Sequence, residues 1–420
     1  MAVLPRFTAW AELDRRIWTL AWARAVNTVG LSLVMSFLGV YVVDERGYSA
    51  ALYGAIALGA NLTQSMTNAW AGELSDRIGR RPIMVGSLVV RAFAIALLGV
   101  QILLHAPLWS LALNFVASSA LRGCFEPAAY ALVADIARPD QRVPAFGLQR
   151  MGINLGWAVG PAAGGLLAVV IPYGAVFFFA AAGLLAAAWT CHGLVDPREK
   201  GAGKHLEPVR LRDAFAEAMT QPPMVALLVG SFLFSLAHTQ MFSVFAIYMT
   251  KGLGLEKEEL GLLYTINGAL VLLMQWPALG AIRRVGTGVA LVSSSLVFAC
   301  GFGLIGAADG FAGGAIAIAV ITLAEVLFAP AHQAAAAESG DAARLGKSFG
   351  LVGFVQMLGV AFGPLVGGAL FDEIGHHHMW MWGAVSGVCL ALAVTFVIYA
   401  RLASTMHSLR AGAKHGRLST

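Results

Sequence analysis

Apolar runs about 20 residues long recur along the whole chain, and they constrain the fold more than any other feature. A helix needs roughly 20 apolar residues to cross the hydrocarbon core of a bilayer. Only 12% of the 420 residues are charged, against about 25% in soluble domains. We therefore predict an all-α integral membrane protein. It would have twelve transmembrane helices near residues 17–43, 51–72, 83–104, 109–134, 143–169, 174–195, 223–250, 260–281, 288–308, 315–337, 347–371 and 380–400.

The longest polar stretch, residues 196–222, divides these segments into six and six. We expect a six-helix bundle on each side of it, at residues 1–195 and 223–401, and a tail at 402–420. The polar stretch reads as a linker with a short amphipathic helix around Leu211–Met219.

The basic residues predict the orientation. Loops and ends on the side of the two termini hold 21 of the 28 Lys and Arg, and the opposite loops hold 3. Positive charge collects on the cytoplasmic side of membrane proteins. We therefore expect a multi-pass protein of a bacterial-type inner membrane, with the linker and both termini in the cytoplasm. Because these charges are dispersed among short loops, we expect no nucleic-acid partner.

The two halves carry an internal repeat. The fifth and eleventh segments both read G-x8-G-x3-G-P-x2-G-G, at positions that differ by 203 throughout. A parallel repeat of six helices is a transporter architecture, and it predicts two pseudo-symmetric bundles. Small residues let helix backbones approach closely. The packing residues expected in the first copy are Gly147, Gly156, Gly160, Pro161, Gly164 and Gly165.

The connection between the second and third segments carries a second motif. Residues 72–81 read G-x-x-x-D-R-x-G-R-R. This resembles the loop signature of the major facilitator superfamily, and the resemblance covers essentially the whole chain. It implies two six-helix bundles around a central cavity, alternating access, and a monomer.

In that family the loop motif acts as a cytoplasmic latch. Asp76 could meet a helix N-terminus, and Arg80 could meet an acid at a helix end, for which Asp135 is the candidate. The alternative is simple anchoring by positive charge. The expected latch residues are Gly72, Asp76, Arg77, Gly79, Arg80 and Asp135.

A narrower resemblance is to the drug:proton antiporter group of this superfamily. The glycine pattern of the fifth segment looks like the antiporter motif of that group, and Arg24, Asn27 and Gly30 in the first segment also resemble it. In the fourth segment, Arg122 and Gly123 match an abbreviated form of the group's pattern. The resemblance implies a role for Arg122 in proton coupling.

Six arginine and glutamate residues lie inside the segments: Arg24, Arg91, Arg122, Glu126, Arg150 and Glu325. Such groups usually face a cavity or a partner, although the arginines nearer the helix ends could snorkel to the interface. Arg122 and Glu126, four residues apart, share one helix face. They predict either a static pair or a proton-sensitive one.

Glu325 lies near the middle of the tenth segment and has no basic residue at i±3 or i±4. A buried carboxyl without a close cation is readily protonated. We expect Glu325 to bind protons or substrate, the alternative being a static salt bridge to Arg122 or another arginine of the first half. His332, seven residues on, shares its face.

Polar residues within the segments suggest a partly polar substrate cavity, although each alone could be an interhelical hydrogen bond. The candidates are Arg24, Asn27, Asn61, Gln64, His238, Gln240, Tyr264, Asn267, His332 and Gln356.

These features predict a secondary active transporter. The leading hypothesis is proton-coupled efflux of small amphipathic organic compounds or drugs, with Glu325, Glu126 and Arg122 in proton coupling. The alternative is a proton-coupled symporter or uniporter of a small nutrient or metabolite, which four intramembrane arginines would suit if it is anionic. An enzyme is not expected, because no nucleophile–base cluster is visible. We expect no cofactor and no resident metal: His376, His377 and His378 read as a solvated loop.

Overall fold

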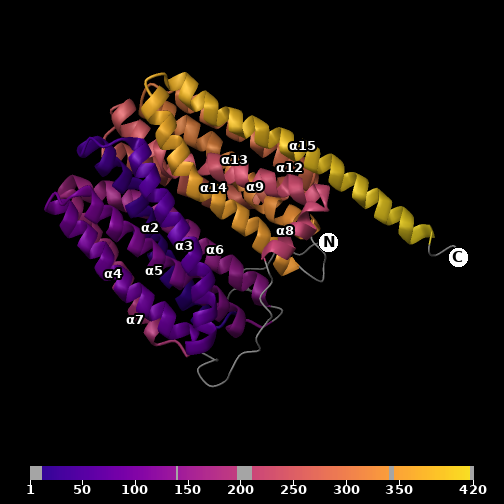
Figure 1. The fold of residues 1–420 in the computed structure, drawn as a ribbon, viewed down its shortest axis with the longest axis horizontal. Coiled ribbons are helices and arrows are strands. Elements are labelled where there is room, and N and C mark those ends of the chain that lie inside the picture. The colour runs from indigo at the N-terminus through magenta and orange to yellow at the C-terminus, as the bar shows by residue number, and fades with distance from the viewer. Residues whose placement is uncertain (1–11, 139–140, 196–210, 340–344, 417–420) are drawn as a thin grey trace.

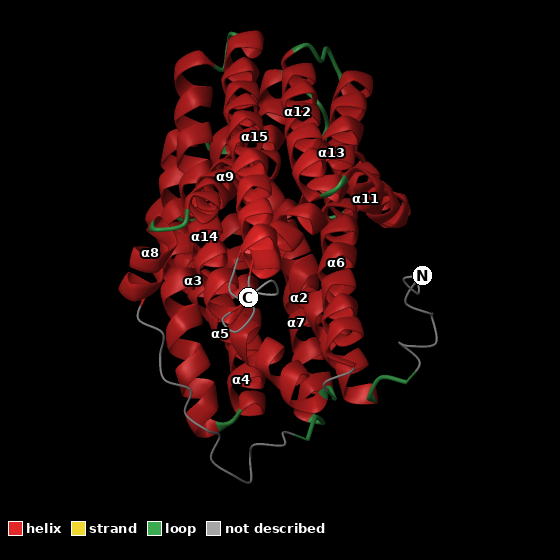
Figure 2. Ribbon diagram, turned by 90° about the vertical axis from the view of Figure 1, so that its right-hand side faces the viewer, coloured by secondary structure: helices red, strands yellow, loops and turns green. Residues whose placement is uncertain are grey.

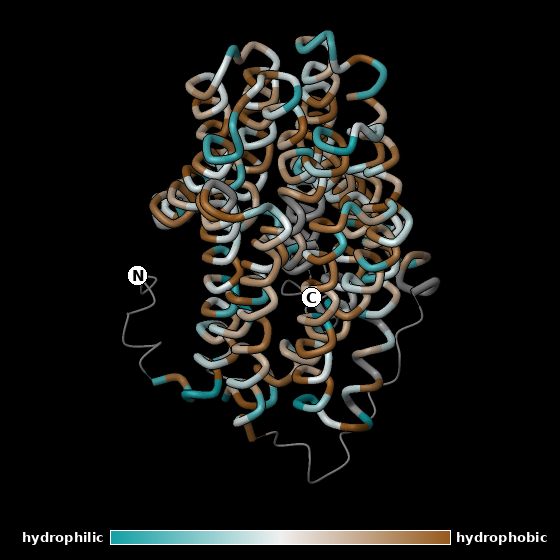
Figure 3. The backbone as a smooth tube through the Cα atoms, turned by 90° about the vertical axis from the view of Figure 1, so that its left-hand side faces the viewer, coloured by the Kyte–Doolittle hydropathy of each residue, from teal (hydrophilic) through white to brown (hydrophobic). Residues whose placement is uncertain are grey.

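A computed structural model describes residues 12–138, 141–195, 211–339 and 345–416. The described residues form helices joined by short connections, and none of them lies in a strand (Figure 2). The expected all-α fold is therefore confirmed. Colouring by hydropathy places most of the apolar residues along the helices and many hydrophilic ones at the connections (Figure 3).

The first half contains six long helices. They are α2 (Arg15–Val40), which continues into the π-helical turn η1 (Tyr41–Glu45), α3 (Ala50–Ile78), α4 (Arg80–Leu103), α5 (Leu108–Ile136), α6 (Arg142–Val170) and α7 (Tyr173–His192). The linker carries α8 (Leu211–Met219), which has the limits expected from the sequence.

The second half begins with α9 (Pro222–His238), followed by η3 (Thr239–Phe242), α10 (Val244–Ile247) and η4 (Tyr248–Gly252). Five long helices complete it: α11 (Lys257–Val285), α12 (Thr287–Gly306), α13 (Phe311–Ser339), α14 (Leu345–Ile374) and α15 (His378–Gly416).

By length and composition, eight helical stretches of the described chain can cross a membrane, or nine if α11, bent by 56° between Gln275 and Pro277, counts as one span. Each of the twelve predicted segments overlaps a long helix. The three helices outside the set of nine are α3, α5 and α6, which carry polar or charged residues within their length. The count of twelve spans therefore stays a prediction.

Large apolar side chains point outward over much of the molecule, as expected of a surface in contact with lipid. Trp18 and Trp189 are exposed near one end of the bundle, and Trp109 and Trp380 near the other. Trp favours the two membrane–water interfaces. We call the first end, where α2 begins and Gly79 joins α3 to α4, the terminal end. The other end, where residues 46–49 join η1 to α3, is called the sealed end.

The two halves form two groups of helices that lie against each other. Figure 1 shows the indigo-to-magenta helices of the first half on one side and the pink-to-yellow helices of the second half on the other. One hydrophobic core lies almost wholly within residues 13–194, and a second almost wholly within residues 218–399.

The repeated glycines explain how the halves are built. A Cβ at Gly156 or Gly160 of α6 would clash with Thr28 or Ser32 of α2. Gly165 faces the start of α11. These glycines therefore allow α6 to pack closely against α2 within its own half and against α11 of the other half.

The second copy repeats this arrangement at the equivalent positions. Gly359 of α14 lies against α9, Gly363 lies against the end of α9 and Thr239 of η3, and Gly368 lies against the backbone of Ala50 in α3. Gly147 differs from its motif partners, because nothing lies within 4 Å of a Cβ placed there. The prediction that Gly147 packs a helix contact is therefore wrong.

The seventh segment departs from the prediction of one continuous helix. The α-helix ends at His238, and Ser243 has a non-helical backbone with φ −122° and ψ −85°. The hydroxyls of Thr239 and Ser243 and the amide of Gln240 donate to carbonyls one turn earlier in the chain. Such back-bonding competes with regular helix bonds, which a count of apolar residues does not detect.

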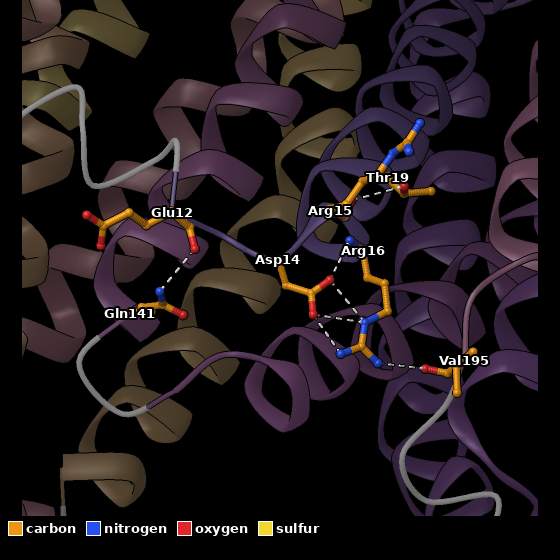
Figure 4. A network of polar contacts seen from close by, with 7 residues as sticks. All are labelled: Glu12, Asp14, Arg15, Arg16, Thr19, Gln141 and Val195. Carbon is orange, nitrogen blue, oxygen red and sulfur yellow. Dashed lines mark hydrogen bonds and ion pairs between the residues drawn. The ribbon is translucent and has the colours of Figure 1, made fainter.

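A polar network holds the start of α2 at the terminal end (Figure 4). The Asp14 side chain accepts from the Arg16 backbone N–H at 2.8 Å and from the Arg16 guanidinium. Arg16 also donates to the Val195 carbonyl, and Gln141 donates to the Glu12 carbonyl. The start of α2 is thus joined to the end of α7 and to the α5–α6 connection.

Candidate functional site

Glu325 lies mid-way along α13 and meets polar side chains from two other helices. Its Oε1 lies 3.8 Å from His238 Nε2 of α9, and its Oε2 accepts from Asn267 Nδ2 of α11 at 3.3 Å. Asn267 also donates to Thr322, one turn before Glu325. The side chains of Glu325 and His238 are 26% and 21% exposed, so both are only partly buried. We call these residues the central cluster: Glu325, His238 and Asn267.

Aromatic rings surround the central cluster on the His238 side. Phe234 stacks on His238 at 5.0 Å between ring centroids, and Phe242 meets it edge-on at 5.4 Å. Phe242 in turn contacts Trp157 of α6, at 4.3 Å between centroids. The rings thus connect the central cluster to the first half of the chain.

The predicted surroundings of Glu325 need two corrections. Its partner in the structure is His238 of the same half, and not Arg122. The charge of Arg150 on α6 also acts on Glu325. His332 does not join the cluster: it bonds to Ser231 at 2.7 Å and stacks on Phe328 in the second half. Helical spacing puts two residues on one face, but neighbouring helices decide what each one meets.

Glu126 and Arg122 do not pair with each other, contrary to the prediction. Arg24 of α2 lies 3.2 Å from the Glu126 carboxylate, donates to its backbone carbonyl and stacks over the Tyr130 ring at 3.6 Å. Arg122 instead donates to Gln64 Oε1 at 3.1 Å. The spacing of four residues does place both on one side of α5, but Arg24 reaches the carboxylate from another helix.

Several predicted cavity residues form bonds between elements. Asn27 is fully buried and accepts from Arg91. The Tyr264 hydroxyl donates to the Met241 carbonyl, and Gln240 donates to the Gly363 carbonyl. Asn61 donates to the Val360 carbonyl, which joins α3 to α14. Gln356 is partly buried on α14. Substrate roles for these residues stay predictions.

The loop motif lies at a junction of only one residue. Gly79, with φ +100°, separates α3 from α4, a conformation that favours glycine. Arg80 donates to Ser75 Oγ at 2.5 Å, and its Nε lies 3.6 Å from Asp135 Oδ2 at the end of α5. The structure thus brings Arg80 and Asp135 together. Arg77 is exposed. Gly72 and Asp76 lie within α3, and the side chain of Asp76 is outside the part that the structure describes.

The sealed end holds contacts between the halves that the sequence reasoning missed. The Asp372 carboxylate of α14 accepts from the backbone N–H groups of Ala50 and Ala51, at 2.9 and 2.7 Å, where α3 begins. Lys257 pairs with Glu45 and lies over the Tyr173 ring. The sequence pattern that could have indicated these contacts is the change from apolar to charged residues at these helix ends.

The sequence predicts only some of the aromatic side chains that surround the central cluster. Phe234 and Phe242 are four residues before and after His238, so helical spacing could have grouped them. Trp157 and Phe328 come from other helices, and no local pattern joins them to His238.

Comparison with known proteins identifies the family. The sequence profile described as Major Facilitator Superfamily matches residues 20–324 and 240–417. The chain belongs to the Major Facilitator Superfamily. It is therefore a multi-pass membrane transporter by family.

Two similar relatives cover most of the chain. The MFS-type transporter YqjV of Bacillus subtilis (strain 168) is 24% identical, over 96% of this chain and 98% of its own length. The multidrug resistance protein MdtH of Aeromonas hydrophila is 27% identical, over 86% of this chain and 89% of its own length.

A solved structure has the same fold. The nucleoside transporter NupG, in a mutant form, superposes with a TM-score of 0.76 at 13% identity, over 91% of this chain and 99% of that one. At this identity the similarity concerns the fold alone.

Proposed function

We propose that this transporter exchanges protons for small amphipathic organic compounds by alternating access, so that protons enter the cell as the compound leaves. In this proposal it lies in a bacterial-type inner membrane with twelve spans and cytoplasmic termini. The six-helix bundles, residues 1–195 and 223–401, are the bodies that move. The names of its MdtH relatives support multidrug efflux as the direction of transport.

The central cluster is the observation that carries the proposal. A carboxylate at Glu325 attracts a protonated His238 and accepts from Asn267. A proton on Glu325 removes the charge attraction and leaves a neutral carboxyl that Asn267 can still hold. Carboxyls within transmembrane helices commonly serve as proton relays. The rings of Phe234 and Phe242 offer an apolar surface beside the carboxyl.

Glu126 supplies a second proton-sensitive element in the first half. Protonation of Glu126 would release Arg24, which is fully buried and has no other carboxylate within 4 Å among the described residues. An uncompensated buried charge is costly. Arg24 would then favour different surroundings, and Arg122, next to it, would respond through their mutual charge.

Alternation between two states requires contacts that open at one end and close at the other. The contacts of Asp372 and Lys257 join the halves at the sealed end. In the proposed orientation this end faces the outside, and the motif at residues 72–81 forms a latch on the cytoplasmic side. The state described here would then be the one that admits compounds from the cytoplasm.

A symporter or uniporter is the second candidate. The nucleoside transporter NupG shares the fold, and the predicted membrane segments of the first half hold four arginines but one glutamate. Both observations are compatible with uptake of a polar or anionic metabolite.

The test is transport in vesicles that contain the purified protein and carry an imposed pH gradient. Fluorescent amphipathic compounds serve as substrates, and a pH-sensitive dye reports proton movement. Glu325→Gln should abolish gradient-driven transport to the level of protein-free vesicles. The matched control is Glu338→Gln, the same change at the exposed end of the same helix; it should transport like the parent protein.

The direction of proton movement separates the two candidates. Protons that move against the compound support antiport, whereas protons that move with it indicate symport and overturn the leading proposal. Gradient-driven transport that persists in both Glu325→Gln and Glu126→Gln would refute the assigned coupling sites.

A further inference from the structure

Three arginines accompany one glutamate in the first half, two of them buried (Arg24 and Arg91) and one partly buried (Arg122). Arg24, Arg91 and Arg122 come from α2, α4 and α5; the charges of Arg122 and Glu126 act on Arg91, and those of Glu126 and Arg24 act on Arg122. At 1.5 Å per residue, Arg24, Arg91 and Glu126 all lie about 14 to 17 Å from the terminal ends of their helices. Two of the arginines and the glutamate therefore lie at a similar depth, and Arg122 lies about one helical turn farther from that end of α5.

The single carboxylate is already engaged. Glu126 pairs with Arg24 at 3.2 Å and also accepts from it through its backbone carbonyl. Arg122 has the neutral amide of Gln64, and Arg91 has that of Asn27. Among the residues that the structure describes, neither Arg91 nor Arg122 has a carboxylate within 4 Å, so two positive charges are uncompensated.

Hydrogen-bond donors in the group also exceed acceptors. Five buried nitrogens have no acceptor in the described part of the chain: Arg24 Nε and Nη1, Asn27 Nδ2, Arg91 Nε and Arg122 Nε. The side chains of Arg24 and Asn27 are fully buried and that of Arg91 nearly so. Buried polar groups normally find a partner. A surplus of both positive charge and donors indicates that an acceptor of negative charge belongs here.

We propose that Arg122, Gln64 and Arg91 form a binding site for an anionic group, in particular a carboxylate, on the wall of the first half. Guanidinium forks match the geometry of a carboxylate and can bind it through two bonds. Gln64 accepts from Arg122 through its oxygen, which leaves its amide N–H groups as donors. Arg122 and Glu126 are only partly buried, so an anion can reach the site past them.

This inference rests on the proposed function in one respect: it makes acidic amphipathic compounds the substrate class. The carboxylate would come from the transported compound. A free inorganic anion such as chloride offers the same negative charge, and the experiment distinguishes the two sources.

The experiment measures thermal unfolding of the purified full chain in detergent. Sodium benzoate or sodium chloride is titrated at constant ionic strength against the bulky sulfonate HEPES. Benzoate should raise the unfolding temperature saturably. In Arg122→Gln the half-saturating benzoate concentration should rise about ten-fold or more, because a charge-assisted bond is lost. Arg122→Lys keeps the positive charge but not the two-donor geometry of the guanidinium. Its half-saturating benzoate concentration should lie between those of the parent and of Arg122→Gln.

The control is Arg283→Gln, which removes one positive charge from the exposed end of α11 and should leave benzoate stabilisation unchanged. If benzoate stabilises the protein and chloride does not, the ligand of the site is an acidic organic compound. If chloride stabilises the protein as much as benzoate does, the site exists but its ligand is a free inorganic anion. No saturable shift with either salt, or the same shift in Arg122→Gln as in the parent, would overturn the proposal. Because thermal unfolding measures binding without transport, its outcome does not depend on whether the vesicle assay detects proton-coupled transport.

Discussion

At the scale of single residues, the Arg24–Glu126 pair decides how the first half tolerates its charges. Arg24 is fully buried, and Glu126 supplies its carboxylate. Removing one partner of a buried pair leaves an uncompensated charge, which costs about 3 to 5 kcal/mol. Removing both avoids this cost. We therefore expect Glu126→Gln to destabilise the protein more than the double variant Arg24→Gln, Glu126→Gln, as measured by thermal unfolding in detergent.

The reverse order of stabilities would contradict this account of the pair. Glu338→Gln provides the control, since it removes an exposed carboxylate whose hydrogen bond to Thr287 lies at the surface. It should change stability much less than Glu126→Gln does.

A second residue-scale prediction concerns pH and the start of α2. The Arg16 guanidinium, hydrogen-bonded to the Asp14 side chain, lowers the pKa of Asp14 below its usual 3.8. Asp14 therefore stabilises the folded state at pH values above 3.8, and this contribution is lost as the pH falls through the lower folded value. Asp14→Ala should cost about 1 kcal/mol at pH 7, because the helix also loses its cap.

Denaturant titrations in mixed micelles at a series of pH values test this expectation. The stability difference between the parent and Asp14→Ala should shrink as the pH falls below about 4. Asp14→Asn keeps a capping oxygen and should lose less at pH 7. A difference that is constant with pH would show that the ionised carboxylate contributes nothing.

At the scale of elements, the contact between α2 and α6 depends on glycines spaced along one face. A Cβ at Gly160 would clash with Ser32 of α2, whereas one at Gly147 would meet open space. Gly160→Val should therefore destabilise the protein by about 1 to 3 kcal/mol through overpacking. Gly147→Val is the matched control, the same change in the same motif and helix, and should be close to neutral in thermal unfolding. Equal effects would mean that the motif glycines do not act through this contact.

The sequence predicts elements well where the physics is local. Segment positions and the limits of α8 follow from hydropathy and amphipathicity, and the contact of Arg80 with Asp135 was anticipated from the ends of two helices. The partners of Glu126 and Glu325 were not predicted, because they come from other helices. Helical spacing identifies a face, but only the packing of α2, α9 and α11 determines which side chain meets it.

At the scale of the whole molecule, the repeat produces two equivalent sets of contacts. In each half a glycine-rich helix packs on the first helix of its own half and on the second helix of the other half, as α6 does with α2 and α11, and α14 with α9 and α3. The final glycines of the two copies, Gly165 and Gly368, both lie at contacts between halves. Helices that serve two bundles at once are suited to transmit a movement of one half to the other.

The last prediction concerns the sealed end, where Asp372 of α14 caps the start of α3 in the other half. A carboxylate at a helix N-terminus contributes about 0.3 to 1 kcal/mol, so Asp372→Asn should shift the population toward the state open at this end by about two- to five-fold. A cysteine introduced at Ala51, in a variant without the four native cysteines, reports the opening through its rate of reaction with a membrane-impermeant maleimide. Glu373→Gln, which removes the neighbouring charge, should leave that rate unchanged. If both variants accelerate labelling equally, general charge and not the cap on α3 holds this end closed; if neither does, the cap does not contribute to closure.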